Sequence, residues 1–319
     1  MRIVVLGTGP FAVPLLQSLH ASQHEVVCAI SRPPRGRKPQ PAPVHVAAEN
    51  LGIEVWLPDT VNSDEARNKL KSLNADLLVV CDYGEILKSA TLASARLGGI
   101  NLHGSLLPKY RGAAPVQWAL LNGDVVTGNT VIQMTPGLDA GPCLGVQPIE
   151  IDPDETAGEL EPRMADLGAE LTRQVVDQLA VGTASPIEQD TAQTTKAPRL
   201  SKEQGCIDWS QSAEQIKNQV RAMHPWPKAF TYWQRAEGDL VRLIIHRAVL
   251  EKNPETCEPP PAPGEVIGVE QGLLVATGQG VLRLETIQPA GKRVMTAEDF
   301  LRGVAMRVGD RLGKIPRPS

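Results

Sequence analysis

The first part of the chain alternates short apolar runs with segments of helical periodicity. Three runs are continuously apolar, namely VVL at 4–6, VVCAI at 26–30 and LLVV at 77–80. Such runs are typical of strands that are covered on both faces. Between them, Phe11, Leu15 and Leu19 recur at helical spacing, and helices are also predicted near residues 43–52 and 63–73. The alternation predicts an α/β fold with an open, doubly wound, mostly parallel sheet.

The pattern continues to about residue 180. Further strands are predicted at GGINLHG (98–104), TGNTVIQM (127–134) and PCLGVQPIEI (142–151), followed by a long helix from about Asp154 to Leu179. Residues 182–206 are polar and are predicted to form an interdomain linker. After them, short β-type runs alternate with glycines and one proline-rich insert, which favours a small β-barrel. The predicted domains are therefore 1–181 and 207–319.

Composition narrows the class of protein. The 319 residues are 42% hydrophobic and 21% charged, as in soluble globular proteins. The net charge of -4 argues against a wholly basic nucleic-acid binder but leaves room for a local basic patch. The five cysteines are widely spaced, without a Cys-x-x-Cys pair, so we expect reduced thiols, a cytoplasmic protein and no metal site. No apolar run is long enough to span a membrane.

The segment GTGPFA at 7–12 fits the glycine fingerprint of a dinucleotide site after a strand. That site also requires an acidic residue at the end of the second strand, to bind the ribose hydroxyls. The second strand ends instead in Ser31 and Arg32, and Arg32 suits only a 2′-phosphate. A tight strand-to-helix turn is the alternative, and it is favoured here.

A second polar pattern lies at the end of the strand GGINLHG. Asn101 and His103 are two residues apart, so their side chains project to one face of the sheet. The carboxyl ends of strands are where ligands bind in open α/β folds. An Asn amide can stabilise an oxyanion, and a His can act as a general acid or base near neutral pH.

A carboxylate is missing from this pair, and Asp139 is the best candidate to supply it. Asp139 lies in the Gly- and Pro-rich segment PGLDAGP between two predicted strands. An Asn, His and Asp set would suit the transfer of a small acyl group to an amine. Each residue also has a structural interpretation: a turn cap for Asp139, a strand-end partner for Asn101 and a core histidine for His103.

These residues lie in segments that resemble the folate-dependent formyltransferases. The similarity is carried by NLHGSLLPKYRGAAPVQWALLNGD at 101–124 and by GLDAGP at 137–142. It extends to GTGPFAVP at the start, DYGEIL at 82–87, LSKEQGCIDWSQSA at 200–213 and HPWPKAF at 224–230. The segment QPAGKRVMTAEDFLRG at 288–303 resembles the branch of the family that acts on tRNA.

The resemblance implies an enzyme with 10-formyltetrahydrofolate as the formyl donor and the α-amino group of methionyl initiator tRNA as the acceptor. Its product would serve translation initiation. It implies that Asn101, His103 and Asp139 are catalytic, with Asp139 orienting protonated His103. It implies an OB-like barrel for the second domain and a monomeric protein. The tetrahydrofolate-binding segment would be Ser105, Leu106, Leu107 and Pro108, with the turn at Tyr83 and Gly84 near the pterin.

The same resemblance implies that a basic loop contacts the tRNA acceptor end. The matching segment is SRPPRGRKPQ at 31–40, which is shorter than in the family. Its expected tRNA-binding residues are Arg35, Arg37 and Lys38. The alternative acceptor is a UDP-amino sugar, since related N-formyltransferases use the same folate chemistry. A tRNA-binding protein without catalysis is the alternative from another class.

Overall fold

The computed structural model describes residues 1–319 except 35, 37–38, 236–238, 252–259, 271 and 315–319. Among the described residues the chain forms two compact units. The first unit comprises Met1–Val116, Val125–Ile151 and Glu159–Pro198. The second comprises Gln117–Asp124, Asp152–Gly158 and Arg199–Ser319. Short internal segments of the chain are therefore counted with the second unit although the sequence places them inside the first domain.

The first unit is built on one sheet with the strand order β3-β2-β1-β4-β5-β7-β8. Its strands are β1 (Arg2–Gly7), β2 (Glu25–Ile30), β3 (Val55–Trp56), β4 (Leu77–Cys81), β5 (Gly99–His103), β7 (Val126–Gln133) and β8 (Cys143–Glu150). The strands β3, β2, β1, β4 and β5 pair in parallel, whereas β7 and β8 are antiparallel to their neighbours. The strand order reverses at β1, as in other doubly wound sheets.

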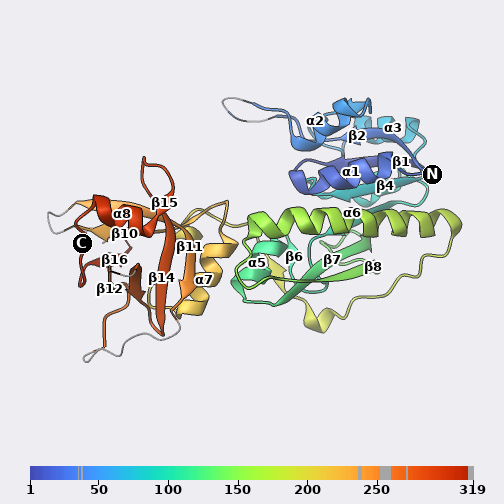
Figure 1. Ribbon diagram of the computed structural model, residues 1–319. Helices are drawn as coiled ribbons and strands as arrows, with labels where there is room; N and C mark the ends of the chain where they lie inside the picture. The colour runs from blue at the N-terminus through green and yellow to red at the C-terminus, as the bar shows by residue number, and fades with distance from the viewer. Residues whose placement is uncertain (35, 37–38, 236–238, 252–259, 271, 315–319) are drawn as a thin grey trace. The chain divides into compact units, whose positions relative to one another are not determined.

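Helices cover both faces of this sheet, which confirms the predicted fold class. They are α1 (Val13–His20), α2 (Pro43–Asn50), α3 (Asp64–Ser72), α4 (Ser89–Leu92) and α6 (Ala157–Val181). Most residues of α5 (Pro115–Leu121) are counted with the second unit. One apolar core joins the sheet to α1, α2 and α6, and the other joins it to α3 and α4. Figure 1 shows α6 running along the sheet, as the first core requires.

Local sequence explains where these helices begin and how closely they pack. Ser63 caps α3 by accepting a hydrogen bond from the amide of Ala66 on its side-chain oxygen. A Cβ added to Gly168 of α6 would lie 2.9 Å from Leu102 Cδ2 on β5. Glycine at this position therefore allows α6 to approach the strand that carries Asn101 and His103.

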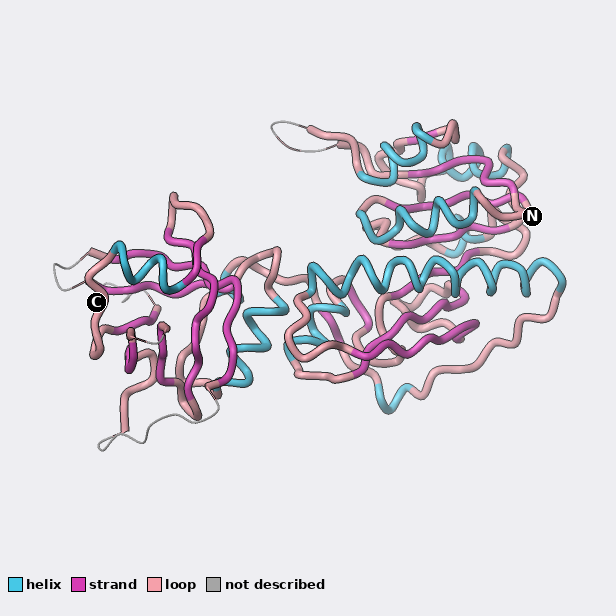
Figure 2. Tube along the Cα trace, in the orientation of Figure 1, coloured by secondary structure: helices cyan, strands magenta, loops and turns pink. Residues whose placement is uncertain are grey.

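The second unit is an antiparallel barrel, which confirms the predicted small β-barrel. Its strands are β10 (Ala229–Gln234), β11 (Leu240–Leu250), β12 (Val266–Gly268), β13 (Leu273–Ala276), β14 (Val281–Pro289), β15 (Met295–Thr296) and β16 (Arg311–Gly313). They follow the order β12-β13-β14-β11-β10-β16, with β15 paired to β14. Figure 2 shows the long strands β11 and β14 side by side. The amide of Leu312 donates to the carbonyl of Gly264, which joins the two ends of the sheet.

Helices also pack against the strands of the second unit. They are α7 (Ala213–Ala222) and α8 (Ala297–Gly303). Ser212 and Gln215 form a reciprocal capping box at the start of α7. Because both side chains satisfy backbone amides that a helix start leaves without partners, this box fixes the point at which α7 begins.

The polar segment after α6 does more than connect the units. Its residues up to Pro198 belong to the first unit. The strand β9 (Lys196–Ala197) pairs in parallel with β6 (Arg111–Gly112), and Ile187 forms a bridge with Cys143 of β8. The pairing involves two residues on each side, so the sequence shows no alternation of apolar and polar positions that would predict it.

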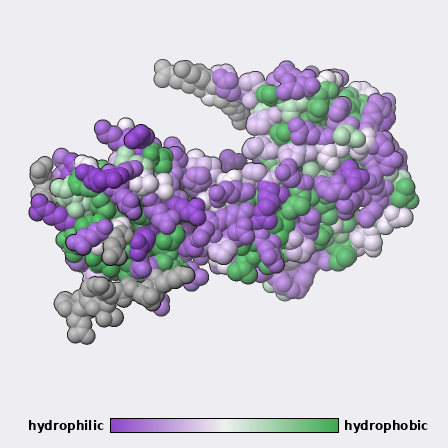
Figure 3. Space-filling view, viewed as in Figure 1, coloured by the Kyte–Doolittle hydropathy of each residue, from purple (hydrophilic) through white to green (hydrophobic). Residues whose placement is uncertain are grey.

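The visible face of each unit is mostly polar (Figure 3). On the face drawn in Figure 3, hydrophilic side chains predominate and apolar ones form small patches between them. Within the described ranges, no helix is both long enough and apolar enough to cross a membrane.

Candidate active site

Strand β5 places Asn101 and His103 on one face of the sheet. Ile100 and Leu102 belong to the core under α6, so the two polar side chains project to the opposite face. Asn101 lies between Val80 of β4 and Ile132 of β7. His103 is the last residue of β5 and is only 5% exposed. The position at the carboxyl end of a central strand agrees with the location expected from the sequence.

The hydrogen bonding of His103 defines its tautomer. Its Nε2 atom lies 2.9 Å from the carbonyl oxygen of Tyr110. A carbonyl only accepts hydrogen bonds, so Nε2 carries a proton and Nδ1 is the atom that gains or loses one. Nδ1 lies 3.8 Å from Oδ2 of Asp139, which makes an ion pair when the imidazole is protonated. The geometry therefore brings His103 and Asp139 together.

The loop after β7, rather than a strand running back beside β5, brings Asp139 to His103. Gln133 lies opposite Ile100, so β7 ends beside the beginning of β5. The loop at 134–142 must then double back toward the end of β5. Within it, Asp139 has a φ of 48°, a left-handed conformation that Asp tolerates better than most residues.

Two further contacts hold Asp139 in place. The backbone amide of Gly112 donates to Oδ2 of Asp139 at 3.0 Å. The side-chain amide of Gln189 donates to the carbonyl of Asp139 at 2.9 Å and to that of Gly141 at 2.7 Å. Gln189 in turn accepts from Arg111, with an Nη2 to Oε1 distance of 2.6 Å. Arg111 thus holds Gln189, and Gln189 holds the backbone of Asp139. The sequence analysis identified neither Arg111 nor Gln189.

Tyr110 also supports the site through an unusual backbone conformation. Its φ is 62°, which costs about 1–3 kcal/mol for a residue other than glycine. Its amide donates to the hydroxyl of Thr195 at 2.8 Å. This conformation directs the carbonyl of Tyr110 at His103. Thr195 comes from the segment predicted to be a linker, and nothing in the sequence pattern indicated its role.

Asn101 differs from the other two residues because its side chain is not committed. Among the described residues its amide group has no hydrogen-bond partner, and the side chain is half-buried. An amide that is fixed on a strand and left with free N–H donors is suited to stabilising an oxyanion. The site therefore offers a donor, a proton carrier and a carboxylate on one face of the sheet.

The segment Ser105–Pro108 follows β5 and runs beside β7. The hydroxyl of Thr130 donates to the carbonyl of Ser105 at 2.7 Å and accepts from the amide of Leu107 at 3.1 Å. The hydroxyl of Ser105 donates to the carbonyl of Lys109, so it stabilises the turn. Leu106 packs against Gly128, where a Cβ would lie 2.5 Å from Leu106 Cδ2. Leu106 and Pro108 remain half-buried, and Leu107 is buried.

The glycine fingerprint at residues 7–12 forms a turn that is unsuited to a dinucleotide. A Cβ at Gly9 would lie 1.7 Å from Oδ2 of Asp82, so the carboxylate contacts this glycine directly. The amide of Thr8 donates to the carbonyl of Asp82 at 3.0 Å. A negative charge at this turn would repel a pyrophosphate, which binds at the same place in Rossmann sites. The dinucleotide alternative is therefore disfavoured.

The predicted tRNA-binding residues Arg35, Arg37 and Lys38 lie outside the described residues. Arg32, which precedes them, is described. Its Nη1 atom lies 2.6 Å from Oε2 of Glu85. The guanidinium of Arg32, which would have to bind a 2′-phosphate in the dinucleotide alternative, is therefore already paired with Glu85.

Known proteins resemble both units of this chain. A model of the formyl transferase family matches residues 1–176, and the model of the formyl transferase C-terminal domain matches residues 199–305. A methionyl-tRNA formyltransferase of Rhodopirellula baltica is 44% identical over 327 residues, covering 98% of this chain and 96% of that protein. One of Geobacter metallireducens is 41% identical over 318 residues, covering 98% and 99%.

Solved structures of lower identity share the fold. An N-formyltransferase of Helicobacter canadensis, in complex with folinic acid and dTDP-3-aminofucose, has a TM-score of 0.66 and 17% identity over 89% of this chain and 99% of that chain. HypX of Aquifex aeolicus, in complex with tetrahydrofolic acid, has a TM-score of 0.59 and 16% identity over 98% and 50%. Together with the family matches over both units, the close relatives decide the assignment. The chain belongs to the formyltransferase family, in the branch of the methionyl-tRNA formyltransferases.

Proposed function

We propose that this chain transfers a formyl group from 10-formyltetrahydrofolate to the α-amino group of methionyl initiator tRNA. The product is N-formylmethionyl-tRNA for translation initiation. The observation that supports this function best is the 41–44% identity, over nearly the whole chain, to proteins named methionyl-tRNA formyltransferase. The arrangement of Asn101, His103 and Asp139 supports the same chemistry independently of the name.

In the proposed reaction the amine attacks the formyl carbon and an oxyanion develops on the formyl oxygen. The amide of Asn101 donates a hydrogen bond to that oxyanion. Because Nε2–H of His103 is held by the carbonyl of Tyr110, His103 exchanges protons at Nδ1. The attacking nitrogen loses a proton and the leaving nitrogen of the folate gains one, and Nδ1 carries it between them. Asp139 faces Nδ1 and pairs with the imidazolium while it holds the proton.

The binding of the two substrates is assigned to separate segments. The folate lies against the segment Ser105–Pro108, in which the half-buried Leu106 and Pro108 present apolar surface. The hydroxyl of Ser105 donates to the carbonyl of Lys109, so Ser105 stabilises the conformation of this segment and does not donate a hydrogen bond to the folate. The tRNA is contacted by Arg35, Arg37 and Lys38. The corresponding domains are a catalytic domain that includes the segment up to Pro198 and an OB-like tRNA-binding domain at 207–319, joined by the remaining residues of the predicted linker 182–206, in a monomeric cytoplasmic protein.

A formyl-transfer assay with 10-formyltetrahydrofolate tests the acceptor. Charged initiator methionyl-tRNA, charged elongator methionyl-tRNA and a UDP-4-amino sugar are compared as acceptors. Rapid formylation of the initiator tRNA alone supports the proposal. Transfer to the sugar would keep the chemistry and replace the acceptor, whereas no transfer to any of them would withdraw the function.

The roles of the site residues are tested by Asn101→Ala, His103→Ala and Asp139→Ala. Each substitution is expected to lower kcat by about 10²–10⁴, since each removes an oxyanion donor, a proton carrier or its carboxylate partner. His45→Ala is the control, because His45 is a helix residue paired with Glu49 on its own helix. The circular dichroism spectra of all four variants should match the wild type. Wild-type rates in all three site variants would refute the assignment.

A further inference from the structure

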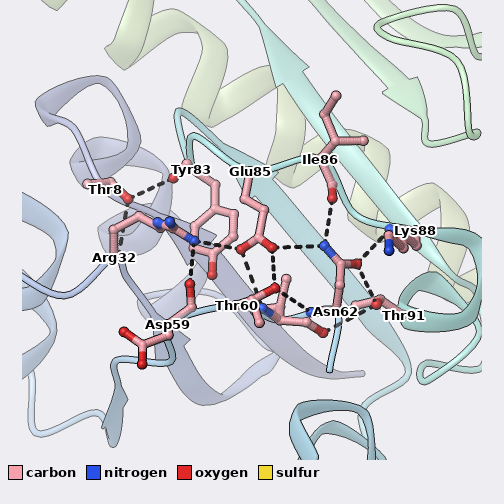
Figure 4. Close-up of polar contacts among 11 residues, drawn as sticks. Thr8, Arg32, Asp59, Thr60, Asn62, Tyr83, Glu85, Ile86, Lys88 and Thr91 are labelled. Carbon is pink, nitrogen blue, oxygen red and sulfur yellow. Dashed lines mark hydrogen bonds and ion pairs between the residues drawn. The ribbon is translucent and has the colours of Figure 1, made fainter. Parts of the chain in front are cut away.

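A cluster of polar side chains lies at the carboxyl ends of β2, β3 and β4, outside the catalytic set. At its centre is the ion pair of Arg32 and Glu85, with a 2.6 Å distance between Nη1 and Oε2. The two side chains are 21% and 17% exposed, so the pair is largely shielded from water. Figure 4 shows the carboxylate of Glu85 between Arg32 on one side and Thr60 and Asn62 on the other.

Both carboxylate oxygens of Glu85 are engaged by groups from neighbouring segments. Oε1 accepts from the hydroxyl of Thr60 and from Nδ2 of Asn62, the latter at 2.9 Å. Oε2 accepts from Arg32 and, at 3.4 Å, from the amide of Val61. A carboxylate with this many donors has little capacity to bind a ligand as well. Glu85 is therefore suited to holding segments together rather than to contacting a substrate.

The cluster connects loops that are far apart in the sequence. Nη1 of Arg32 also donates to the carbonyl of Asp59 at 3.1 Å. Asn62 donates to the carbonyl of Ile86 at 2.9 Å and accepts from the amide of Lys88 at 2.8 Å. The residues after β3 are thus tied both to the end of β2 and to the turn after β4.

Tyr83 and Thr8 extend the cluster to the end of β1. Tyr83 is 2% exposed, and burial raises its pKa to about 12, with the charge of Glu85 adding to the shift and that of Arg32 opposing it. The hydroxyl of Thr8 donates to the carbonyl of Tyr83 at 3.0 Å and accepts from the amide of Arg32 at 3.4 Å. The turn at Tyr83 is therefore fixed from two sides.

The place of these residues in the chain gives the cluster a role. Arg32 directly precedes the segment that contains Arg35, Arg37 and Lys38. Strand β4, which ends before Glu85, pairs with β5 through Val80 and Asn101. One ion pair thus fixes both the start of the basic segment and the turn next to the catalytic strand.

We propose that Arg32 and Glu85 are positioning residues, which hold the start of the basic segment in the orientation that binds the acceptor tRNA. This inference rests on the proposed function. The pair contacts neither Asn101 nor His103, and the carbonyl of Tyr83 keeps its hydrogen bond from Thr8 when the pair is lost. Loss of the pair therefore weakens tRNA binding and leaves the chemical step at saturating substrates intact. Removing either partner leaves the other as an unpaired, largely buried charge, so the two single substitutions should have similar effects.

The test compares Glu85→Gln, Arg32→Gln and the double variant with Asp76→Asn. Asp76 precedes β4 at the opposite end of the strand, where it accepts from the amide of Arg2 and from Arg96 at 3.0 Å. It is the matched control because its side chain is 27% exposed and it also joins an arginine to a strand end. Three quantities are measured: the Kd for charged initiator tRNA, kcat at saturating substrates, and hydrogen exchange at the amides of Val61 and Lys88.

Each single variant of the pair is expected to weaken tRNA binding about tenfold or more, with kcat within about twofold of wild type. The Kd of the double variant for tRNA should be no higher than that of the single variant with the higher Kd, because both substitutions remove the same interaction. Exchange at Val61 and Lys88 should rise in all three variants, whereas Asp76→Asn should change none of these quantities.

Several results would overturn the proposal. These are an unchanged Kd despite faster exchange, an unchanged exchange rate in Glu85→Gln, or an equal loss of binding in Asp76→Asn. A fall in kcat as large as the rise in Kd would also overturn it, since it would place the pair in the chemistry. Failure of the proposed function is seen separately, as absence of formyl transfer by the wild-type protein.

Discussion

Replacing Gly112 by alanine should damage the active site although Gly112 contributes no side chain to it. Its φ is 135°, a region that residues with a Cβ rarely adopt. A Cβ there would lie 2.4 Å from the carbonyl oxygen of Ala197 and 2.9 Å from its carbonyl carbon. Both are backbone atoms of β9, so a side-chain rotation cannot relieve the clash. Either β6 and β9 separate or the backbone at Gly112 moves.

The structure gives the size of both effects. Separation of β6 and β9 would break hydrogen bonds such as that from the amide of Ala113 to Ala197, each contributing about 1 kcal/mol. Backbone strain adds about 1–3 kcal/mol. If the backbone at Gly112 moves instead, the carboxylate of Asp139 loses the charge-assisted hydrogen bond that the amide of Gly112 donates to it. Such a hydrogen bond contributes about 1.5–3 kcal/mol. We therefore expect Gly112→Ala to lower the unfolding free energy by about 2–5 kcal/mol and kcat by about 10–100-fold.

Gly104→Ala is the matched control from the same stretch of the chain. A Cβ at Gly104 would lie 3.5 Å from Phe11 Cζ and no closer to any other group outside its chain neighbours, which is an ordinary contact. Its stability should stay the same or rise by up to about 1 kcal/mol, because alanine restricts the unfolded chain. Urea unfolding followed by circular dichroism and initial rates of formyl transfer measure both variants. Wild-type stability and rate in Gly112→Ala, or equal damage in Gly104→Ala, would refute the reasoning.

Two further predictions concern charge. Asp208 has a pKa of about 2 because Ser210 and Lys314 hydrogen-bond its carboxylate, so this group stabilises the fold above pH 4 and the contribution disappears as the pH falls toward 2. In Asp208→Asn, acid titration of the unfolding free energy should show a shallower loss over that interval, and an unchanged profile would contradict it. The affinity for initiator tRNA should fall steeply between about 50 and 200 mM salt, and replacing Arg35, Arg37 and Lys38 by Gln should flatten that dependence in a filter-binding titration.

The sequence predicted the residues that lie on regular elements better than those that lie on loops. Asn101 and His103 could be paired because the two-residue period of a strand places them on one face. Their strand could be placed in the sheet because it follows the apolar runs that form the earlier strands. Asp139 was identified by its residue type and its Gly- and Pro-rich surroundings. The path of its loop could not be derived, because it depends on the antiparallel register of β7 with β5.

The supporting residues left no signal in the sequence. Gln189 and Arg111 are 78 positions apart, and Arg32 and Glu85 are 53 apart. A hydrogen bond between such residues has no periodicity, and each residue alone is an ordinary polar side chain. Thr195 was hidden further by its place in a polar segment that resembled a linker. The pairing of β6 with β9, together with the hydrogen bonds of Gln189 and Thr195, shows that this segment is part of the site.

The division between these two kinds of residue has a physical cause. A strand fixes the direction of a side chain through the sheet's own hydrogen bonds, so Asn101 and His103 need little further support. Asp139 and Tyr110 instead have left-handed backbone conformations, which persist only where surrounding contacts stabilise them. Those contacts come from Gly112, Gln189 and Thr195. The geometry of this active site is therefore more sensitive to the loss of these supporting contacts than to changes in the strand β5. Substitutions in the 187–197 segment should then impair formyl transfer even though none of its residues is assigned to the chemistry.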